Sequence, residues 1–147
     1  MDINVKIKLV RPGASMPEKA TSGSAAYDLC VWPDAPVTIG VGEILSLPTG
    51  IAMQPDREDV AALILGRSGL GTKHGITLAN SVGLIDSDYR GEMRVTLINR
   101  GTQPFTVNPG DRVAQLLFVP VYAAAMTLAD ELDSTERGTG GFGSTGI

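Results

Sequence analysis

The sequence predicts an all-β fold, either a sandwich, a jelly roll or a barrel. Short runs of strand-forming residues recur at short, regular intervals, and turn residues separate them. Eighteen glycines and nine prolines favour a chain with many turns. At the N-terminus, Ile3, Val5, Ile7 and Leu9 alternate with polar residues. This alternation is typical of a strand and not of a signal peptide.

The candidate strands follow one another along most of the chain. After the N-terminal strand, residues 11–24 form a polar connection, and the further candidate strands are 25–31, 37–39, 44–47, 50–54, 60–65, 75–79, 82–85, 91–98, 105–107 and 112–121. Residues 68–74 are expected to form a single helical turn, although two glycines weaken it. Residues 122–132 are rich in alanine but only loosely periodic, so that segment stays ambiguous.

Bulk properties place the chain among globular proteins of one domain. It has 147 residues, of which 43% are hydrophobic and 19% charged, and this composition excludes a disordered chain. A net charge of −4 argues against a nucleic-acid partner. No uncharged apolar run reaches membrane-spanning length. Cys30 is the only cysteine, so no internal disulfide forms, and we expect a soluble, cytoplasmic protein.

Residues 79–93 (ANSVGLIDSDYRGEM) form the stretch around which the other motifs are organised. Val82, Leu84 and Ile85 suit a buried strand, residues 93–98 suit a second one, and a turn joins them as a hairpin. Asp86 lies where the first strand ends, which is a rigid place for a general base. The alternative is that Asp86 only caps the turn.

Residues 66–75 (GRSGLGTKHG) are candidates for binding an anion. Arg67, Ser68 and Gly69 follow an apolar strand at a possible helix start, where backbone N–H groups, a hydroxyl and a guanidinium converge. The alternative is a surface turn in which Ser68 caps the helix.

The chain closes with RGTGGFGSTG at residues 137–146, so we divide it into a β domain, 1–136, and a flexible, glycine-rich tail, 137–147. The tail holds a literal G-x-G-x-x-G, but no helix can follow it, and this excludes a dinucleotide-binding fingerprint. Arg137 and the isolated Phe142 suit a phosphate and an aromatic base, respectively. The alternative is a disordered tail without a role in binding.

The candidate metal ligands are carboxylates. His74 and Cys30 are single residues without the spacing of a zinc site. Asp28 and Asp86 instead suit Mg²⁺ that is held largely by substrate phosphates and water.

Five segments resemble one family: residues 25–29 (AAYDL), 66–76, 79–93, 112–118 (RVAQLLF) and 137–146. In this order they are similar to the motifs of the homotrimeric dUTPases. The resemblance covers essentially the whole chain. It implies a distorted jelly-roll or β-clip barrel, active sites at subunit interfaces, and Mg²⁺-dependent hydrolysis of dUTP to dUMP and pyrophosphate. Such an activity limits uracil incorporation into DNA and supplies dUMP for dTTP synthesis.

The resemblance also implies roles in the reaction. Asp86 would be the base that orients and deprotonates the water attacking the α-phosphorus. Gln115 would help to hold this water or the hydration shell of the metal. Asp28 would support the Mg²⁺ site through water.

Substrate binding follows from the same resemblance. Arg67, Ser68 and Gly69 would bind phosphate oxygens. Asn80 would read the uracil edge, while the closed hairpin excludes the methyl group of thymine. Tyr89 would pack on the deoxyribose and leave no room for a 2′-hydroxyl.

The tail would complete the site. By resemblance, Arg137 would clamp the terminal phosphates and Phe142 would stack over the uracil. Gly143 and Ser144 would add phosphate contacts. A tail that orders over the ligand would exclude water from the reaction.

Some residues depart from the family pattern, and two rival functions remain. Gly66 stands where the family commonly has proline, Gly71 where it has alanine, and Arg90 is left without a role.

The related dCTP deaminases share the fold, but the segment typical of them is not found. A non-catalytic regulator with the same pocket is the other rival, and the presence of Asp86, Gln115 and Arg137 speaks against it.

Overall fold

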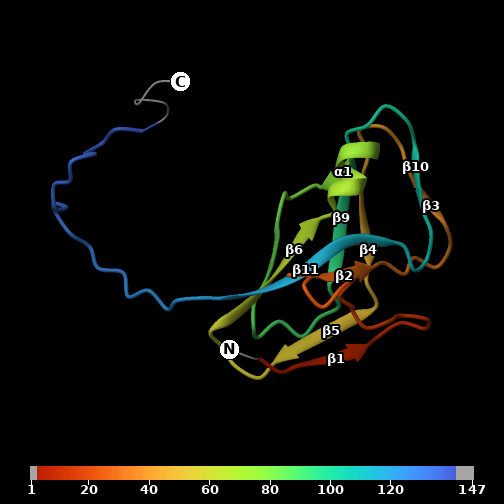
Figure 1. Cartoon of the computed structure of the whole chain (residues 1–147), viewed down its shortest axis with the longest axis horizontal. Coiled ribbons are helices and arrows are strands. Elements are labelled where there is room, and N and C mark those ends of the chain that lie inside the picture. The colour runs from red at the N-terminus through yellow and green to blue at the C-terminus, as the bar shows by residue number, and fades with distance from the viewer. Residues whose placement is uncertain (1–2, 142–147) are drawn as a thin grey trace.

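The computed structural model describes residues 3–141 and confirms the all-β prediction. Its strands are β1 (Val5–Leu9), β2 (Tyr27–Cys30), β3 (Val37–Ile39), β4 (Ile44–Pro48), β5 (Ile51–Pro55), β6 (Val60–Gly66), β7 (Ile76–Leu78), β8 (Gly83–Ile85), β9 (Arg94–Asn99), β10 (Phe105–Val107) and β11 (Arg112–Pro120). One short helix, α1 (Ser68–His74), stands at the end of β6 within the described range (Figure 1). It ends where Gly75 adopts φ 69°, a left-handed conformation that glycine reaches without strain.

The strands pair into four antiparallel groups. The largest has the order β2-β11-β6-β8, and a second has the order β4-β9-β7. β1 pairs with β5, and β3 pairs with β10. β6 and β11 are the longest strands, and β11 crosses the body in Figure 1 before the chain leaves it.

Apolar side chains from all these groups meet in one core. Leu29, Ile64, Val95, Leu97 and Leu116 are each at most 2% exposed. In β9 the buried residues alternate with more exposed ones, as the period-2 pattern predicts. Burial of this kind is the main force that holds short strands together.

Asn99 is a polar member of the core that the sequence pattern did not single out. It is fully buried at the end of β9. Its side-chain amide donates to the carbonyl of Ile39 at 2.9 Å and to that of Gln103 at 2.8 Å. Its carbonyl oxygen accepts from Gly101 N–H at 2.9 Å. The amide therefore joins the end of β9 to the loop that follows it and to β3, which is 60 residues away in sequence.

The prediction of a buried strand at Val82, Leu84 and Ile85 is partly wrong. Val82 is 45% and Leu84 63% exposed, while Ile85 is half-buried. β8 is a three-residue edge strand that pairs only with β6, so alternate side chains point outward. Gly83 faces inward, where an added Cβ would lie 3.1 Å from Ile64 Cβ.

The two strands around Asp86 also do not form a hairpin. β8 pairs with β6, whereas β9 pairs with β4 and β7. The intervening segment therefore crosses from one sheet to another. We call residues 86–92 the crossover turn.

Residues 121–141 extend away from the body without helix or strand (Figure 1). The ambiguous segment 122–132 is thus not a helix in the single chain. Its apolar side chains lie in solvent: Tyr122 is 96%, Met126 94% and Leu128 97% exposed. No helix in residues 3–141 is long and apolar enough to cross a membrane.

Candidate functional site

A cluster of three charged side chains lies where β2, β6 and β11 meet. Asp28 is the central member, and its side chain is only 11% exposed. Its Oδ2 accepts a hydrogen bond from Arg112 Nη1 at 3.0 Å, and its Oδ1 lies 3.4 Å from Arg67 Nε. Arg67 Nη1 also donates to the backbone carbonyl of Arg112 at 2.7 Å. The Arg67 guanidinium is thus fixed from two sides before any ligand arrives.

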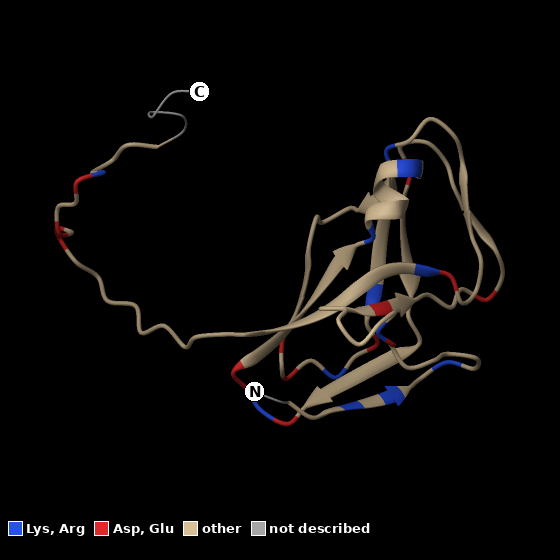
Figure 2. Cartoon of the chain, in the orientation of Figure 1, with Lys and Arg blue, Asp and Glu red and all other residues tan. Residues whose placement is uncertain are grey.

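This cluster carries one positive charge in excess, because two guanidiniums share one carboxylate. The protein as a whole is acidic, with a net charge of −4. Figure 2 shows basic and acidic positions interspersed along the chain. A local excess of guanidinium beside a partly buried carboxylate suits the binding of phosphate oxygens.

Gln115 is placed next to the charged cluster by the register of the sheet. It lies opposite Asp28 on β2 and opposite Leu65 on β6. Side chains at directly paired positions share a face of the sheet and lie about 5 Å apart at Cβ. The structure therefore brings together Gln115, Asp28 and Arg67, which lie far apart in sequence.

Ser68 and Gly69 open α1 directly after Arg67, and both are exposed. The helix is capped by the extended backbone of Arg67 (φ −91°, ψ 129°), without a side-chain cap hydrogen bond. The alternative in which Ser68 caps the helix is therefore wrong. The first amides of a helix have no intrahelical partner, so this turn offers donors beside the Arg67 guanidinium.

The crossover turn carries the second group of predicted residues. Asp86 is exposed directly after β8, and its backbone carbonyl accepts from Tyr89 N–H at 3.2 Å. Arg90 Nη1 donates to the carbonyl of Ser87 at 2.7 Å and to that of Tyr89 at 3.1 Å. Arg90, which had no assigned role, thus braces the turn from within.

Glu92 anchors the far end of the turn, and no local pattern in the sequence pointed to this role. Its Oε1 accepts from Arg11 Nε and from Gly50 N–H, both at 2.9 Å. Its backbone carbonyl accepts from the Tyr89 hydroxyl at 3.1 Å. Arg11 and Glu92 are 81 residues apart in sequence, so only the folded chain shows the pair.

The two groups lie at opposite ends of β6. Asp86 lies beyond Ile85, which pairs with Ala62, and it lines a hollow together with Ala61. Arg67 follows the last residue of β6, six residues after Ala61. At about 3.3 Å per residue this separates Asp86 from Arg67 by about 20 Å. One chain does not bring the predicted base and the predicted phosphate residues together.

Asn80 and Arg137 lie on other segments than the crossover turn. Asn80 is exposed in the turn between β7 and β8, at the end of β8 away from Asp86. Arg137 is on the extended tail, where its Nε donates to the carbonyl of Gly140 at 2.8 Å. Phe142, Gly143 and Ser144 lie outside the described residues.

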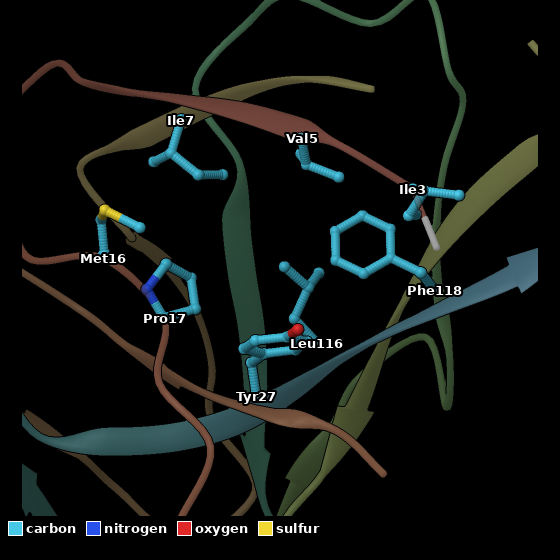
Figure 3. A pocket seen from close by; sticks show the side chains of 8 residues that line it. All are labelled: Ile3, Val5, Ile7, Met16, Pro17, Tyr27, Leu116 and Phe118. Atoms are coloured by element: carbon cyan, nitrogen blue, oxygen red, sulfur yellow. The ribbon is translucent and has the colours of Figure 1, made fainter. Parts of the chain in front are cut away.

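The apolar hollow in Figure 3 is a separate feature. Its volume is about 200 Å³, and residues of β1, β2, β11 and the first connection line it. Tyr27 and Leu116 line it, and they neighbour Asp28 and Gln115 along their strands. Successive residues of a strand point to opposite faces. The hollow therefore opens on the face away from the charged cluster, and the residues that line it are uncharged.

The acidic groups of the described residues do not form a metal cage. No cluster of three or more His, Cys, Asp or Glu side chains that could hold a metal occurs within residues 3–141. Each carboxylate oxygen of Asp28 faces a guanidinium. A carboxylate has about four lone-pair sites, so Asp28 retains capacity for one water molecule of a hydrated ion. This donor set fits a Mg²⁺ ion that the substrate brings with it.

Cys30 lies beside the charged cluster, opposite Arg112 in the sheet. Partial burial raises the pKa of its thiol, and a hydrogen bond with Ser15 and the charge of Arg112 oppose this shift. The thiol is therefore protonated at neutral pH, which does not suit a nucleophile.

Comparisons with known proteins agree with the motifs. The family model for dUTPase matches residues 13–146. The deoxyuridine 5'-triphosphate nucleotidohydrolase of Desulfitobacterium hafniense is 50% identical over 147 residues, covering 99% of this chain and 97% of that protein. The one from Shewanella piezotolerans is 53% identical over 146 residues, covering 98% and 96%.

Solved structures show the same fold. A dUTPase variant of Staphylococcus bacteriophage 80alpha, solved with dUpNHpp, superposes with a TM-score of 0.88 at 24% identity, covering 98% of this chain and 99% of that one. A variant dUTPase from phage phi11 of S. aureus, described with a structural Mg(II) ion, gives a TM-score of 0.78 at 22% identity, with coverage of 87% and 97%.

Proposed function

The chain belongs to the dUTPase family, and on this premise we propose how its two groups of residues share the reaction. The protein is a dUTP diphosphatase that hydrolyses dUTP to dUMP. The observation that carries the proposed mechanism is the fixed Arg67 guanidinium beside the open start of α1, together with an exposed carboxylate on a braced turn. In this mechanism the residues around Arg67 bind phosphate, and the crossover turn with Asp86 activates water.

The reaction is an attack of water on the α-phosphorus of dUTP. Asp86 takes the proton of this water, the new P–O bond forms, and the bond to the bridging oxygen breaks. The products are dUMP and pyrophosphate. The exposure of Asp86 in the single chain supports this role, because the carboxylate is open to water and substrate.

Phosphate binding belongs to the residues at the end of β6 and the start of α1. Arg67 offers a preoriented guanidinium, while Ser68 and Gly69 offer a hydroxyl and backbone donors. Gln115, on the same sheet face as Asp28, orients the water or the hydration shell of the metal. Phosphoryl transfer depends mostly on positioning and charge stabilisation, which these residues supply.

Mg²⁺ enters with the triphosphate in this proposal. When bound, it would neutralise charge on the phosphate oxygens and help to align them. Asp28 would hold it through one water molecule, since its carboxylate is already shared by two guanidiniums. The family relationship and the donor set support this dependence.

Selectivity for the nucleoside rests on Asn80 and Tyr89. Asn80 reads the uracil edge from its exposed turn, and Tyr89 packs on the deoxyribose. Tyr89 lines a hollow of about 330 Å³ together with Asp86, so the ring stands beside the proposed base. Tight packing at this place excludes a 2′-hydroxyl.

The complete site forms in a homotrimer. Asp86 and Arg67 are too far apart to act on one triphosphate within a chain, and a neighbouring copy can bring the missing group. The exposed side chains of Leu84 and Ile44, at 63% and 60%, support an interface, because large apolar residues favour burial. Light scattering should report three chains, and a fully active monomer would refute this assembly.

The tail, residues 137–147, acts as a closing segment on the β domain, residues 1–136. Arg137 clamps the terminal phosphates, Phe142 covers the uracil, and Gly143 and Ser144 add phosphate contacts. The extended course of residues 121–141 gives the tail the reach to close over a site away from its own body (Figure 1).

In the cell the enzyme limits uracil incorporation into DNA and supplies dUMP. The free thiol of Cys30 supports the cytoplasm as its location.

Product analysis tests this function directly. The protein is mixed with Mg²⁺ and, in separate reactions, dUTP, dTTP, UTP or dCTP. We expect dUMP and pyrophosphate from dUTP alone. Release of ammonia from dCTP would identify a deaminase. Tight binding of dUTP without product would indicate a regulator that kept the pocket.

A further inference from the structure

Gly91 lies directly under the ring of Tyr89 in the crossover turn. A Cβ added at Gly91 would lie 2.5 Å from Tyr89 Cζ and 3.0 Å from Cε2, and closer still to the phenolic oxygen. The backbone of Gly91 does not adopt the left-handed conformation that favours glycine. Position 91 therefore requires glycine for the space that the ring occupies, and not for its backbone angles.

A hydrogen bond within the turn holds the ring against it. The Tyr89 hydroxyl donates to the carbonyl of Glu92 at 3.1 Å, and the carboxylate of Glu92 is in turn fixed by Arg11 and Gly50. Tyr89 nevertheless remains 44% exposed. The ring therefore lies against the turn and exposes its remaining surface to solvent.

We propose that Gly91 is a positioning residue that sets the selectivity of the enzyme for deoxyribose over ribose, by letting the Tyr89 ring fold back onto the turn. This inference rests on the proposed function, because it assumes that Tyr89 packs on the sugar of the substrate. Gly91 itself touches neither the sugar nor the phosphates in this proposal.

The displacement that a side chain would cause follows from the distances. Ordinary van der Waals contact begins at 3.4 Å, so a methyl group at position 91 pushes the far end of the ring away by about 1 Å. Errors of about 1 Å in a positioned group can change rates by about 100-fold. A ring that is displaced into solvent no longer fills the space beside the sugar, so the 2′-hydroxyl of UTP is admitted. This movement lowers the preference for dUTP.

The test compares Gly91→Ala with the unchanged enzyme. We measure kcat and KM for dUTP and UTP and expect the ratio of the two kcat/KM values to fall at least tenfold. Gly23→Ala is the matched control, because a Cβ there meets no atom within 4 Å and the backbone angle is equally ordinary. Its ratio should equal that of the unchanged enzyme. Since the half-exposed ring can move into solvent, Gly91→Ala should fold, and its melting temperature and oligomeric state check this.

A second pair of variants tests whether Gly91→Ala acts through the Tyr89 ring. In a Tyr89→Ala background, where the ring is absent, adding Gly91→Ala should leave the ratio unchanged. A further fall in that background, or an unchanged ratio in Gly91→Ala alone, overturns the inference. If the unchanged enzyme does not hydrolyse dUTP, the proposed function fails instead. The two failures are therefore distinguishable.

Discussion

Asp28→Asn removes the charge that holds two guanidiniums together and keeps the shape of the side chain. At an effective dielectric constant of 20, each pair at 3.0 to 3.4 Å has a Coulomb energy of about 5 kcal/mol. Desolvation and screening offset most of this. The Arg112 side chain is 56% exposed, so its pair contributes about 0.5 kcal/mol, as surface pairs do.

The pair with Arg67 is better shielded, because that side chain is 30% and Asp28 11% exposed. Allowing for the repulsion left between the two guanidiniums, it should contribute about 1.5 kcal/mol. We therefore expect Asp28→Asn to lower the free energy of unfolding by about 2 kcal/mol. Urea denaturation at a fixed protein concentration measures this change.

The same variant should impair catalysis through substrate binding. Arg67 keeps its bond to the carbonyl of Arg112 but loses the carboxylate that orients its Nε. We expect KM for dUTP to rise about tenfold, and the Mg²⁺ concentration for half-maximal activity to rise as well. Steady-state kinetics at several Mg²⁺ concentrations measures both effects.

Asp34→Asn is the matched control for this experiment. Asp34 makes one ion pair, with Arg11, and its side chain is 96% exposed. The same chemical change there should alter stability by less than about 0.5 kcal/mol and leave KM unchanged. If Asp28→Asn behaves like this control in both assays, the reasoning about the charged cluster is wrong.

Four further predictions concern other parts of the molecule. Asp86→Asn should keep dUTP binding within about threefold and lower kcat at least about 1,000-fold, because the base is lost; isothermal titration and product assays measure the two, and near-normal turnover would reject Asp86 as the base. Truncation before Arg137 should leave a folded oligomer with little activity, since residues 121–141 make no strand in the body; a truncated enzyme as fast as the full chain would exclude the tail from the mechanism. Asn99→Leu should lower the free energy of unfolding by about 3 kcal/mol, because one buried and two partly buried hydrogen bonds lose their partner; a loss below about 1 kcal/mol in chemical denaturation contradicts this. Burial raises the pKa of the Cys30 thiol, so the thiolate forms only above the ordinary pH range of a cysteine and reaction with a thiol reagent should be slow at pH 7 and accelerate as pH rises. If the reagent labels Cys30 at neutral pH as fast as it labels free cysteine, the thiol pKa is not raised and this prediction is wrong.

The charged cluster and the crossover turn suggest how an acidic protein binds a triphosphate. Positive charge is concentrated at Arg67 and Arg112, and one carboxylate fixes both. The proposed base, Asp86, is kept about 20 Å away within each chain. In the proposed trimer, assembly brings the two groups together, so an isolated chain holds no competent site.

The amino-acid sequence by itself determined the local elements and the chemical inventory. Alternation at period two and turns rich in glycine and proline placed nearly every strand, because these signals act between residues a few positions apart. The ordered motifs identified the family for the same reason, since each motif is a short local segment. Asp86, Arg67 and Gln115 were predicted from such short segments, and their roles stay predictions.

Only the tertiary structure decided which elements pair and which side chains meet. The sequence could not show that β8 pairs with β6 and not with β9, or that Leu84 points outward from an edge. It also could not show that Asp28 joins Arg112 across 84 residues, or that Glu92 joins Arg11 across 81. Pairing between distant segments depends on the free energy of the whole packed chain, and no window of neighbouring residues contains that information.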